Sequence, residues 1–377
     1  MKAVLPLGLT LSIAVLVGCS APPKAGSGTA GLPIEAGSSR DTGPVGNERG
    51  AVVAVSEPDE LVYLVNRLTE SELAELAELA PNVRFEVAPE REELAERVRE
   101  AHGIDAHLCS AELLGDAPNL RWVQAWSAGV DRYITIDELV ENEDIVLTNM
   151  QGIHGPAIAD HAMAMLLAHT RGLREWYRAM DEGEWNRGRA REMSALRGRT
   201  LLVVGMGGIG SEIAVRAKAF GMRVTATVRT RRETPPFVDY LGLAEELDAL
   251  LPDADVVAVC VPLTDETRGM FDSERFGRMK RGAYLINIAR GKVIDTDAML
   301  AALDEGILSG VGLDVTDPEP LPSDHPLWQR DDVIVTPHVA GRAEITQDRR
   351  WALFKENVRR FGAGEPLLNV VDKDAGY

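Results

Sequence analysis

Three residues of different chemical type follow apolar runs typical of buried strands. Arg290 comes after "YLINIA", Glu319 lies in "GLDVTDPEPLP", and His338 ends "VIVTPH". A guanidinium can fork onto a carboxylate and an adjacent ketone oxygen, which fixes and polarises the ketone carbon. An imidazole can protonate the alkoxide that then develops, and a carboxylate on its other ring nitrogen orients it and stabilises its charged form. These residue types could together bind an anion and transfer a proton, provided that the three side chains meet.

Each of the three residues also has a plainer interpretation. Arg290 alone could be a surface cation, His338 a turn residue after Pro337, and Glu319 a loop carboxylate between two prolines. Their joint position after strand-like runs favours catalysis, because the carboxyl ends of parallel strands meet at one edge of a sheet. The other histidines are expected to serve packing or solvation, and none has a spacing that predicts a metal site.

A glycine pattern predicts a dinucleotide site. "TLLVVGMGGIG" places Gly205, Gly207 and Gly210 between an apolar strand and a helix. Gly205 would allow the tight turn, Gly207 the approach of a pyrophosphate, and Gly210 close packing of helix on strand. The free N–H groups and the positive dipole end of the helix would then face the phosphates, with Gly208 and Ile209 in the same turn.

The residues after the next strand favour NADP(H), although NAD(H) remains possible. No Asp or Glu occurs between Glu212 and Glu233, so the carboxylate that usually binds a ribose 2′-hydroxyl is missing. The strand "RVTATV" is followed by Arg229, Thr230, Arg231 and Arg232. Guanidinium groups and a hydroxyl suit a 2′-phosphate, while a solvated basic turn is the alternative.

Strand-like and helix-like segments alternate from residue 51 onward, which predicts parallel sheets with helices on both faces. We expect an α/β protein with two doubly wound domains. A Rossmann cofactor domain (151–337) is inserted into a flavodoxin-like substrate domain, formed by 51–150 together with 338–377. One long helical stretch is predicted over 155–185, a strand at "AHLCS" (106–110), and a final helix from 344 that ends near Gly362.

The N-terminus differs in kind from the rest of the chain. Residues 1–19 have one Lys and an apolar run too short to span a bilayer comfortably, and Leu-Val-Gly-Cys resembles the lipobox of bacterial lipoproteins. Cys19 would then be lipidated, and the Gly-, Ser- and Pro-rich segment 20–50 would be a flexible linker. The alternatives are a mis-assigned start or a chance Cys. The expected location is the cell envelope if the leader is real, and the cytoplasm otherwise.

Composition limits the partners of the protein. The 377 residues carry a formal net charge of −19, which disfavours nucleic acid and anionic lipid headgroups. We therefore expect no nucleic-acid partner, and membrane contact only through a lipid on Cys19. At this length two domains are more natural than a single core.

Several motifs together resemble the D-isomer-specific 2-hydroxyacid dehydrogenase family, most closely its glyoxylate and hydroxypyruvate reductase branch. They occur in the order "WSAGVDRY", "VVGMGGIG", "CVPLTDETRGMF", "LINIARGKVID", "GLDVTDPEPLP" and "TPHVAG". The resemblance implies that Arg290, Glu319 and His338 are catalytic, that backbone N–H groups of Ala128, Gly129 and Val130 hold the substrate carboxylate with Arg290, and that the protein is a homodimer. It also implies further cofactor contacts at Val261, Pro262, Thr267, Ile288, Ala289, Asp314 and Gly341.

Two features depart from the usual pattern. The leader is unusual for a family that is mostly cytoplasmic, and Arg342, after "HVAG", could alter substrate choice. Export would separate the protein from nicotinamide cofactors. The alternative function is therefore a non-catalytic, membrane-tethered protein that binds the cofactor without turnover.

Overall fold

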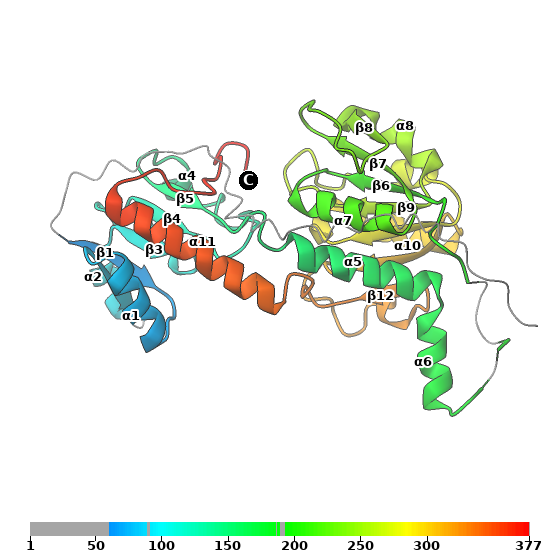
Figure 1. The fold of residues 1–377 in the computed structure, drawn as a ribbon, viewed down its shortest axis with the longest axis horizontal. Helices are drawn as coiled ribbons and strands as arrows, with labels where there is room; N and C mark the ends of the chain where they lie inside the picture. The colour runs from blue at the N-terminus through cyan, green and yellow to red at the C-terminus, as the bar shows by residue number, and fades with distance from the viewer. Residues whose placement is uncertain (1–59, 89–90, 186, 189–192, 377) are drawn as a thin grey trace, which may run out of the picture. The chain divides into compact units, whose positions relative to one another are not determined.

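The computed structural model describes residues 60–88, 91–185, 187–188 and 193–376. The predicted leader, Cys19 and the linker lie outside these residues. The described chain forms two parallel sheets, of five and seven strands, which confirms the predicted fold class (Figure 1). No helix in the described ranges is long and apolar enough to cross a membrane.

The first sheet has the strand order β2-β1-β3-β4-β5, which is the flavodoxin-like order. Its strands are β1 (Leu61–Val65), β2 (Val83–Val87), β3 (Gly103–Asp105), β4 (Trp122–Gln124) and β5 (Val146–Thr148). The second sheet has the order β12-β11-β10-β9-β6-β7-β8, in which the order reverses next to β6, as in a Rossmann fold. Its strands are β6 (Thr200–Val204), β7 (Arg223–Val228), β8 (Tyr240–Leu243), β9 (Val256–Val259), β10 (Ala283–Asn287), β11 (Leu308–Leu313) and β12 (Val333–Val335).

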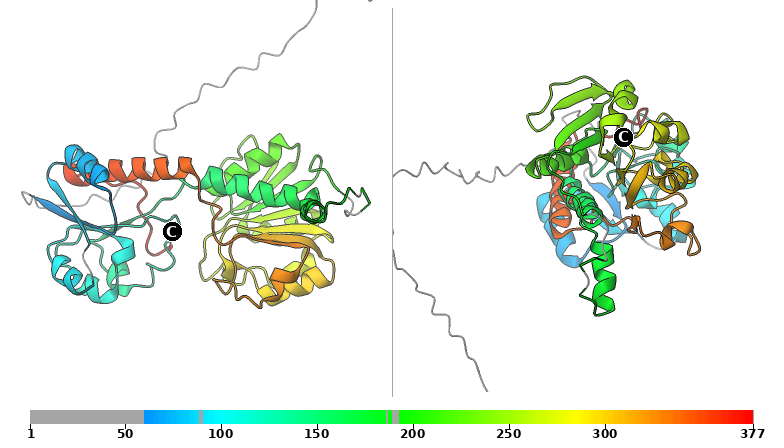
Figure 2. Two further views of the ribbon diagram at one scale, coloured as in Figure 1. Left: turned by 90° about the horizontal axis from the view of Figure 1, so that it is seen from below. Right: turned by 90° about the vertical axis from the view of Figure 1, so that its right-hand side faces the viewer.

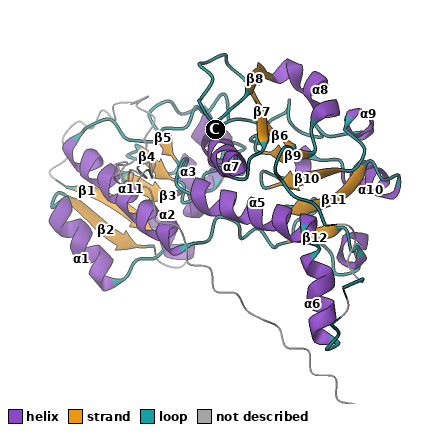
Figure 3. Ribbon diagram, turned by 45° about the vertical axis from the view of Figure 1, so that its right-hand side comes forward, coloured by secondary structure: helices purple, strands orange, loops and turns teal. Residues whose placement is uncertain are grey.

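Both faces of each sheet are covered, which is why the strands are continuous apolar runs. Side chains of β6 alternate: Leu202 and Val204 join one buried cluster, whereas Leu201 and Val203 join another on the opposite face. In the first sheet, Leu64 and Tyr63 divide between two clusters in the same way. The apolar runs therefore encode two helical layers per sheet, which Figures 2 and 3 show.

The helices supply those layers. Around the first sheet they are α1 (Glu70–Leu79), α2 (Arg91–Arg97), α3 (Ala111–Gly115), α4 (Asp137–Val140) and α11 (Glu344–Ala363). Those associated with the second are α5 (Gly155–Thr170), α6 (Leu173–Asp181), α7 (Gly208–Ala219), α8 (Leu247–Leu250), α9 (Ser273–Arg278) and α10 (Thr296–Asp304). The predicted domain limits near residues 150 and 337 fall in connections between these elements and stay predictions.

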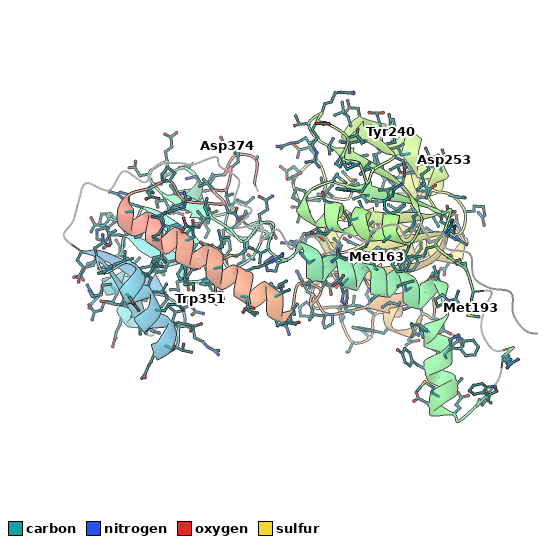
Figure 4. The ribbon with its side chains drawn as sticks, viewed as in Figure 1. Met163, Met193, Tyr240, Asp253, Trp351 and Asp374 are labelled. Carbon is teal, nitrogen blue, oxygen red and sulfur yellow. The ribbon has the colours of Figure 1, made fainter. Side chains whose placement is uncertain are left out.

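The last helix returns to the first sheet, as expected. Leu353, Phe354 and Phe361 of α11 belong to the buried cluster that contains Tyr63. At its surface, Glu75 of α1 accepts a hydrogen bond from the Trp351 indole at 2.8 Å. Trp351 is labelled on α11 in Figure 4. This packing brings the N-terminal half of α11 toward the site described below.

Three local predictions were wrong. The stretch 155–185 is not one helix, because Gly172 adopts a left-handed conformation (φ 63°) that ends α5 and begins α6. Residues 106–110 are not a strand: β3 ends at Asp105 and a short 3-10 turn follows. Strand β8 was not predicted, since "YLGL" is short and only partly buried at the edge of the sheet.

Candidate active site

Three neighbouring strands end at the candidate site. Arg290 follows β10, Glu319 follows β11 and His338 follows β12, and these strands are adjacent in the sheet. The His338 Nδ1 atom lies 2.7 Å from the Glu319 Oε1 atom. Glu319 therefore engages one ring nitrogen, which leaves Nε2 to exchange a proton with a ligand.

The turn that carries His338 is fixed by a buried carboxylate. His338 adopts a left-handed backbone conformation (φ 53°), which is unfavourable for a residue with a side chain unless its surroundings hold it. The Asp314 carboxylate, only 3% exposed, accepts hydrogen bonds from the N–H groups of Val339 and Ala340 (2.9 Å each) and from the Thr336 hydroxyl (2.6 Å). Asp314, predicted to contact the cofactor, also holds the turn in place.

Arg290, which follows a strand of the second sheet, is held by a carboxylate from the loop after β4 of the first sheet. Its Nε donates to the Asp131 carboxylate at 3.1 Å, and a terminal guanidinium nitrogen lies 3.0 Å from the same oxygen. A Cβ atom on Gly129 would lie 1.7 Å from that nitrogen, and one on Gly291 would lie 1.9 Å from the Thr316 carbonyl oxygen. Gly129 is therefore required to leave room for the Arg290 guanidinium. Gly291 is required because the backbone of Thr316 passes directly beside it.

The loop after β4 directs its amide groups away from the protein's own acceptors. The carbonyls of Ala128, Gly129 and Val130 accept hydrogen bonds from the Asn149 amide, the Ser127 hydroxyl and the Tyr133 N–H, respectively. Within the described ranges, none of the N–H groups of residues 128–130 donates to another protein group. The loop is thus pinned by its carbonyls, and its donors remain available to an anion such as a carboxylate.

The glycine loop has the geometry that its sequence predicts. Gly205 has a φ of 94°, and a Cβ atom on Gly210 would lie 2.5 Å from the Gly205 carbonyl oxygen. A Cβ atom on Gly207 would meet nothing within 4 Å, because this position borders open space at the start of α7. No side chain caps this helix at Gly207. The loop therefore fits a dinucleotide pyrophosphate.

The basic residues after β7 lie beside this loop. Arg229, Thr230 and Arg231 line the same cavity as Gly207. The Arg232 guanidinium donates to the carbonyl of Met206, within the glycine loop. The predicted 2′-phosphate site is thus adjacent to the predicted pyrophosphate site.

One cavity of about 810 Å³ brings most of the predicted residues together. Its walls contain residues 127–131, the glycine loop, Arg290 and His338. The predicted cofactor residues that also line it are Gly205, Gly208, Ile209, Val261, Pro262, Ile288, Ala289, Asp314 and Gly341. The cavity thus combines the candidate acid, the candidate anion-binding groups and the dinucleotide loop.

Three predicted residues lie outside the cavity wall. Gly210 packs beneath the glycine loop, and Glu319 contacts His338 without lining the cavity. Thr267 is buried, and its hydroxyl donates to the Pro262 carbonyl at 2.6 Å, so it braces a loop that does line the cavity. These residues support the site indirectly.

Sequence reasoning missed several polar residues. Asp131, the partner of Arg290, lies within "WSAGVDRY", but nothing in that motif identifies its partner. Asp105 is 2% exposed and accepts a hydrogen bond from the Trp126 indole at 2.9 Å. Burial raises the pKa of Asp105, while hydrogen bonds from Asn66, Trp126 and Tyr63 act in the opposite direction. Arg350 and His154 also line the cavity.

Comparisons with known proteins agree with this geometry. The family "D-isomer specific 2-hydroxyacid dehydrogenase, NAD binding domain" matches residues 163–340. A glyoxylate reductase from Korarchaeum cryptofilum is 38% identical over 296 residues, which cover 77% of this chain and 88% of that protein.

Two solved structures extend the comparison. A D-isomer specific 2-hydroxyacid dehydrogenase from Xanthobacter autotrophicus, in complex with NADPH and MES, matches with a TM-score of 0.73 and 30% identity over 85% of this chain and all of that one. An NADPH-dependent glyoxylate/hydroxypyruvate reductase from Sinorhizobium meliloti matches with a TM-score of 0.72 and 27% identity over 84% of this chain and all of that one. The chain therefore belongs to the D-isomer specific 2-hydroxyacid dehydrogenase family, as an NAD(P)-dependent oxidoreductase similar to the glyoxylate reductases.

Proposed function

We propose that this protein reduces small 2-oxo acids such as glyoxylate and hydroxypyruvate at C2, with NADPH preferred over NADH. The observation that carries the proposal is the pair formed by His338 and Glu319 at 2.7 Å, in the same site as Arg290 and the glycine loop. The similarity to a glyoxylate reductase and to a glyoxylate/hydroxypyruvate reductase supports this choice of substrates.

The substrate carboxylate is bound by the N–H groups of residues 128–130 and by the Arg290 guanidinium. The second arm of Arg290 polarises the ketone oxygen, so that the C2 carbon is positioned and made electrophilic. A nicotinamide cofactor held at the glycine loop would supply the hydride for C2. His338 Nε2 gives its proton to the developing alkoxide, and Glu319 holds the ring through Nδ1 in both protonation states.

The preference for NADPH is supported by charge. Arg229, Thr230 and Arg231 line the cavity next to the glycine loop, and no carboxylate replaces them in the sequence after β7. Guanidinium groups attract a 2′-phosphate and offer nothing comparable to a bare ribose. A double variant, Arg229→Ala with Arg231→Ala, should raise KM for NADPH about tenfold or more while changing KM for NADH much less. Equal effects on the two cofactors would contradict this assignment.

Steady-state kinetics tests the reaction itself. Glyoxylate, hydroxypyruvate and pyruvate, each with NADPH or NADH, should oxidise the cofactor, which absorbance at the nicotinamide band reports. Arg290→Ala and His338→Ala should each lower kcat by about 10²- to 10⁴-fold and leave cofactor affinity largely intact. Cofactor binding without oxidation across the whole panel would instead support the non-catalytic cofactor-binding protein.

We also propose that Cys19 carries a lipid that attaches the protein to the cell envelope. The support is the apolar run before Leu16-Val17-Gly18-Cys19 and the Gly-, Ser- and Pro-rich segment behind it. Labelling of growing cells with a palmitate analogue should mark the wild-type protein and not Cys19→Ala. Equal labelling of both would refute the anchor.

A further inference from the structure

Arg350 of α11 is a half-buried cation that lines the cavity without an anionic partner. No carboxylate in the described ranges forms an ion pair with it, and its Nε atom is buried without a hydrogen bond. Only two other buried side-chain N or O atoms of the described residues lack a hydrogen bond of normal geometry, His154 Nδ1 and Thr346 Oγ1. Thr346 and Arg350 are both on α11, and Arg350 lies close enough to His154 for its charge to lower the pKa of that histidine.

The position of Arg350 is fixed by an aromatic ring. Its guanidinium carbon lies 5.5 Å from the centroid of the Trp126 ring. That ring packs on Phe354 of α11, with centroids 4.7 Å apart, and its indole N–H is held by the buried Asp105. Burial lowers the pKa of Arg350, but a guanidinium stays charged at neutral pH. The cavity wall therefore presents a fixed positive charge.

The neighbours of Arg350 do not neutralise it. Gln347, one turn earlier on α11, and Arg342 line the cavity as well, and neither brings a negative charge. Burial and the charge of Arg350 lower the pKa of His154 to about 4, although the nearby Met150 carbonyl acts in the opposite direction. His154 is therefore neutral at physiological pH and can bind a polar group without adding repulsion.

This charge lies on the substrate side of the site. Trp126 directly precedes the loop 127–130, whose Gly129 contacts the Arg290 guanidinium. A Cβ atom on Gly341, three residues after His338, would lie 3.1 Å from the His154 ring. The glycine loop for the pyrophosphate belongs to the other sheet. Arg350 is thus beside the groups that bind and protonate the substrate.

A half-buried guanidinium without a partner is unfavourable unless a ligand supplies an anion. Arg290 and the loop 127–130 already account for the carboxylate next to the ketone. We infer that Arg350, seated on Trp126, binds a second anionic group, a carboxylate or a phosphate, at the far end of the substrate. The preferred substrates are then dianionic 2-oxo acids, an inference that rests on the proposed reduction of 2-oxo acids.

Matched substrates test the inference on the unaltered protein. 2-Oxoglutarate and 2-oxovalerate have five carbons each, and only the former has a distal carboxylate. Phosphohydroxypyruvate and hydroxypyruvate differ by a phosphate. With NADPH, kcat/KM should be about tenfold or more higher for the charged member of at least one pair. The pair with the larger ratio shows whether the site accepts a carboxylate or a phosphate.

The Arg350→Met variant tests the residue. It should reduce the charged-to-uncharged ratio of kcat/KM about tenfold or more, whereas Arg349→Met, which changes the neighbouring cation outside the cavity wall, should leave the ratio unchanged. Calorimetric titration of the NADP⁺-loaded protein with the same acids measures the ratio of affinities without turnover. Arg350→Lys, which keeps the charge, should retain part of the preference.

The outcomes separate the two proposals. Ratios near one in both pairs, by kinetics and by calorimetry, would refute the second anion site even if glyoxylate is reduced rapidly. Charged acids that bind preferentially without oxidising NADPH would retain the anion site and refute the reductase. Equal loss of the ratio in the Arg350 and Arg349 variants would show that a general change in charge, and not a contact, is responsible.

Discussion

A buried carboxylate at the end of β11 determines where the candidate acid lies. Asp314 accepts three hydrogen bonds from the segment 336–340, which contains His338 in a left-handed conformation. Its replacement by alanine would leave the buried N–H of Ala340 and the part-buried N–H of Val339 without an acceptor, and the loss of such a bond costs about 1–3 kcal/mol.

The expected effect of Asp314→Ala is therefore a loss of about 2–5 kcal/mol in unfolding free energy and a decrease in kcat of about tenfold or more. Urea denaturation and steady-state kinetics measure the two quantities. Asp324→Ala, at an exposed position before the turn at 326–329, is the matched control and should change neither. An Asp314→Ala protein with normal kcat would show that His338 keeps its place without this support.

The lowered pKa of His154 predicts that the stability of the protein depends on pH. Its pKa is lowered to about 4 in the folded protein, from about 6.5 in an unfolded chain. Between these values the unfolded state binds more protons, so stability is complete above about pH 6.5 and decreases as the pH falls toward 4. The decrease in unfolding free energy over this pH range is on the order of 3 kcal/mol.

Unfolding by urea at several pH values should show this decrease in the wild-type protein, and His154→Gln should make the curve flatter over the same range. His107→Gln, at an exposed histidine, serves as the control and should leave the slope as it is. A His154→Gln protein with the full pH dependence would assign the titration to another group.

At the scale of elements, the segment from β6 to α7 contains glycines with two different roles, one in packing and one in ligand binding. Gly210 lies where a side chain would push helix from strand, whereas Gly207 borders open space. Gly207 also has φ −88° and ψ −157°, which alanine can adopt.

Gly207→Ala should therefore fold with stability within about 1 kcal/mol of wild type and still lose NADPH affinity by about tenfold or more, because its Cβ would occupy the space required by the pyrophosphate. Gly210→Ala should lose about 1–3 kcal/mol of stability as well as affinity. Thermal unfolding without cofactor and fluorescence titration with NADPH distinguish the two effects. Equal stability losses would mean that Gly207 is also a packing position.

For the whole molecule, α6 offers an apolar surface for the predicted homodimer. Tyr177 and Met180 are 62% and 73% exposed, and α6 extends away from the second sheet (Figures 1 and 4). Burial of such side chains in an interface contributes about 1.5–3 kcal/mol each.

The double variant Tyr177→Glu with Met180→Glu should halve the mass measured by light scattering after gel filtration. Phe220→Glu, which places the same charge at another exposed apolar position, should leave the mass unchanged. If the wild-type protein is monomeric, or the double variant stays dimeric, the interface is not on α6.

The sequence by itself determined the parallel α/β class, the glycine loop and the three residues that follow β10, β11 and β12. These features are local: an apolar run, a φ-permissive glycine and a polar residue after a strand can be read within a few positions. It also contained the break at Gly172, but a glycine within a helical pattern does not by itself show whether the helix ends.

Only the tertiary structure decided which distant residues meet. It placed β10, β11 and β12 side by side, set Asp131 against Arg290, and seated Arg350 on a tryptophan held by Asp105. These contacts join segments that are far apart in the chain, and they depend on the packing of whole helices and strands. No short-range pattern records such packing, because the same residue types would serve equally well as solvated surface groups.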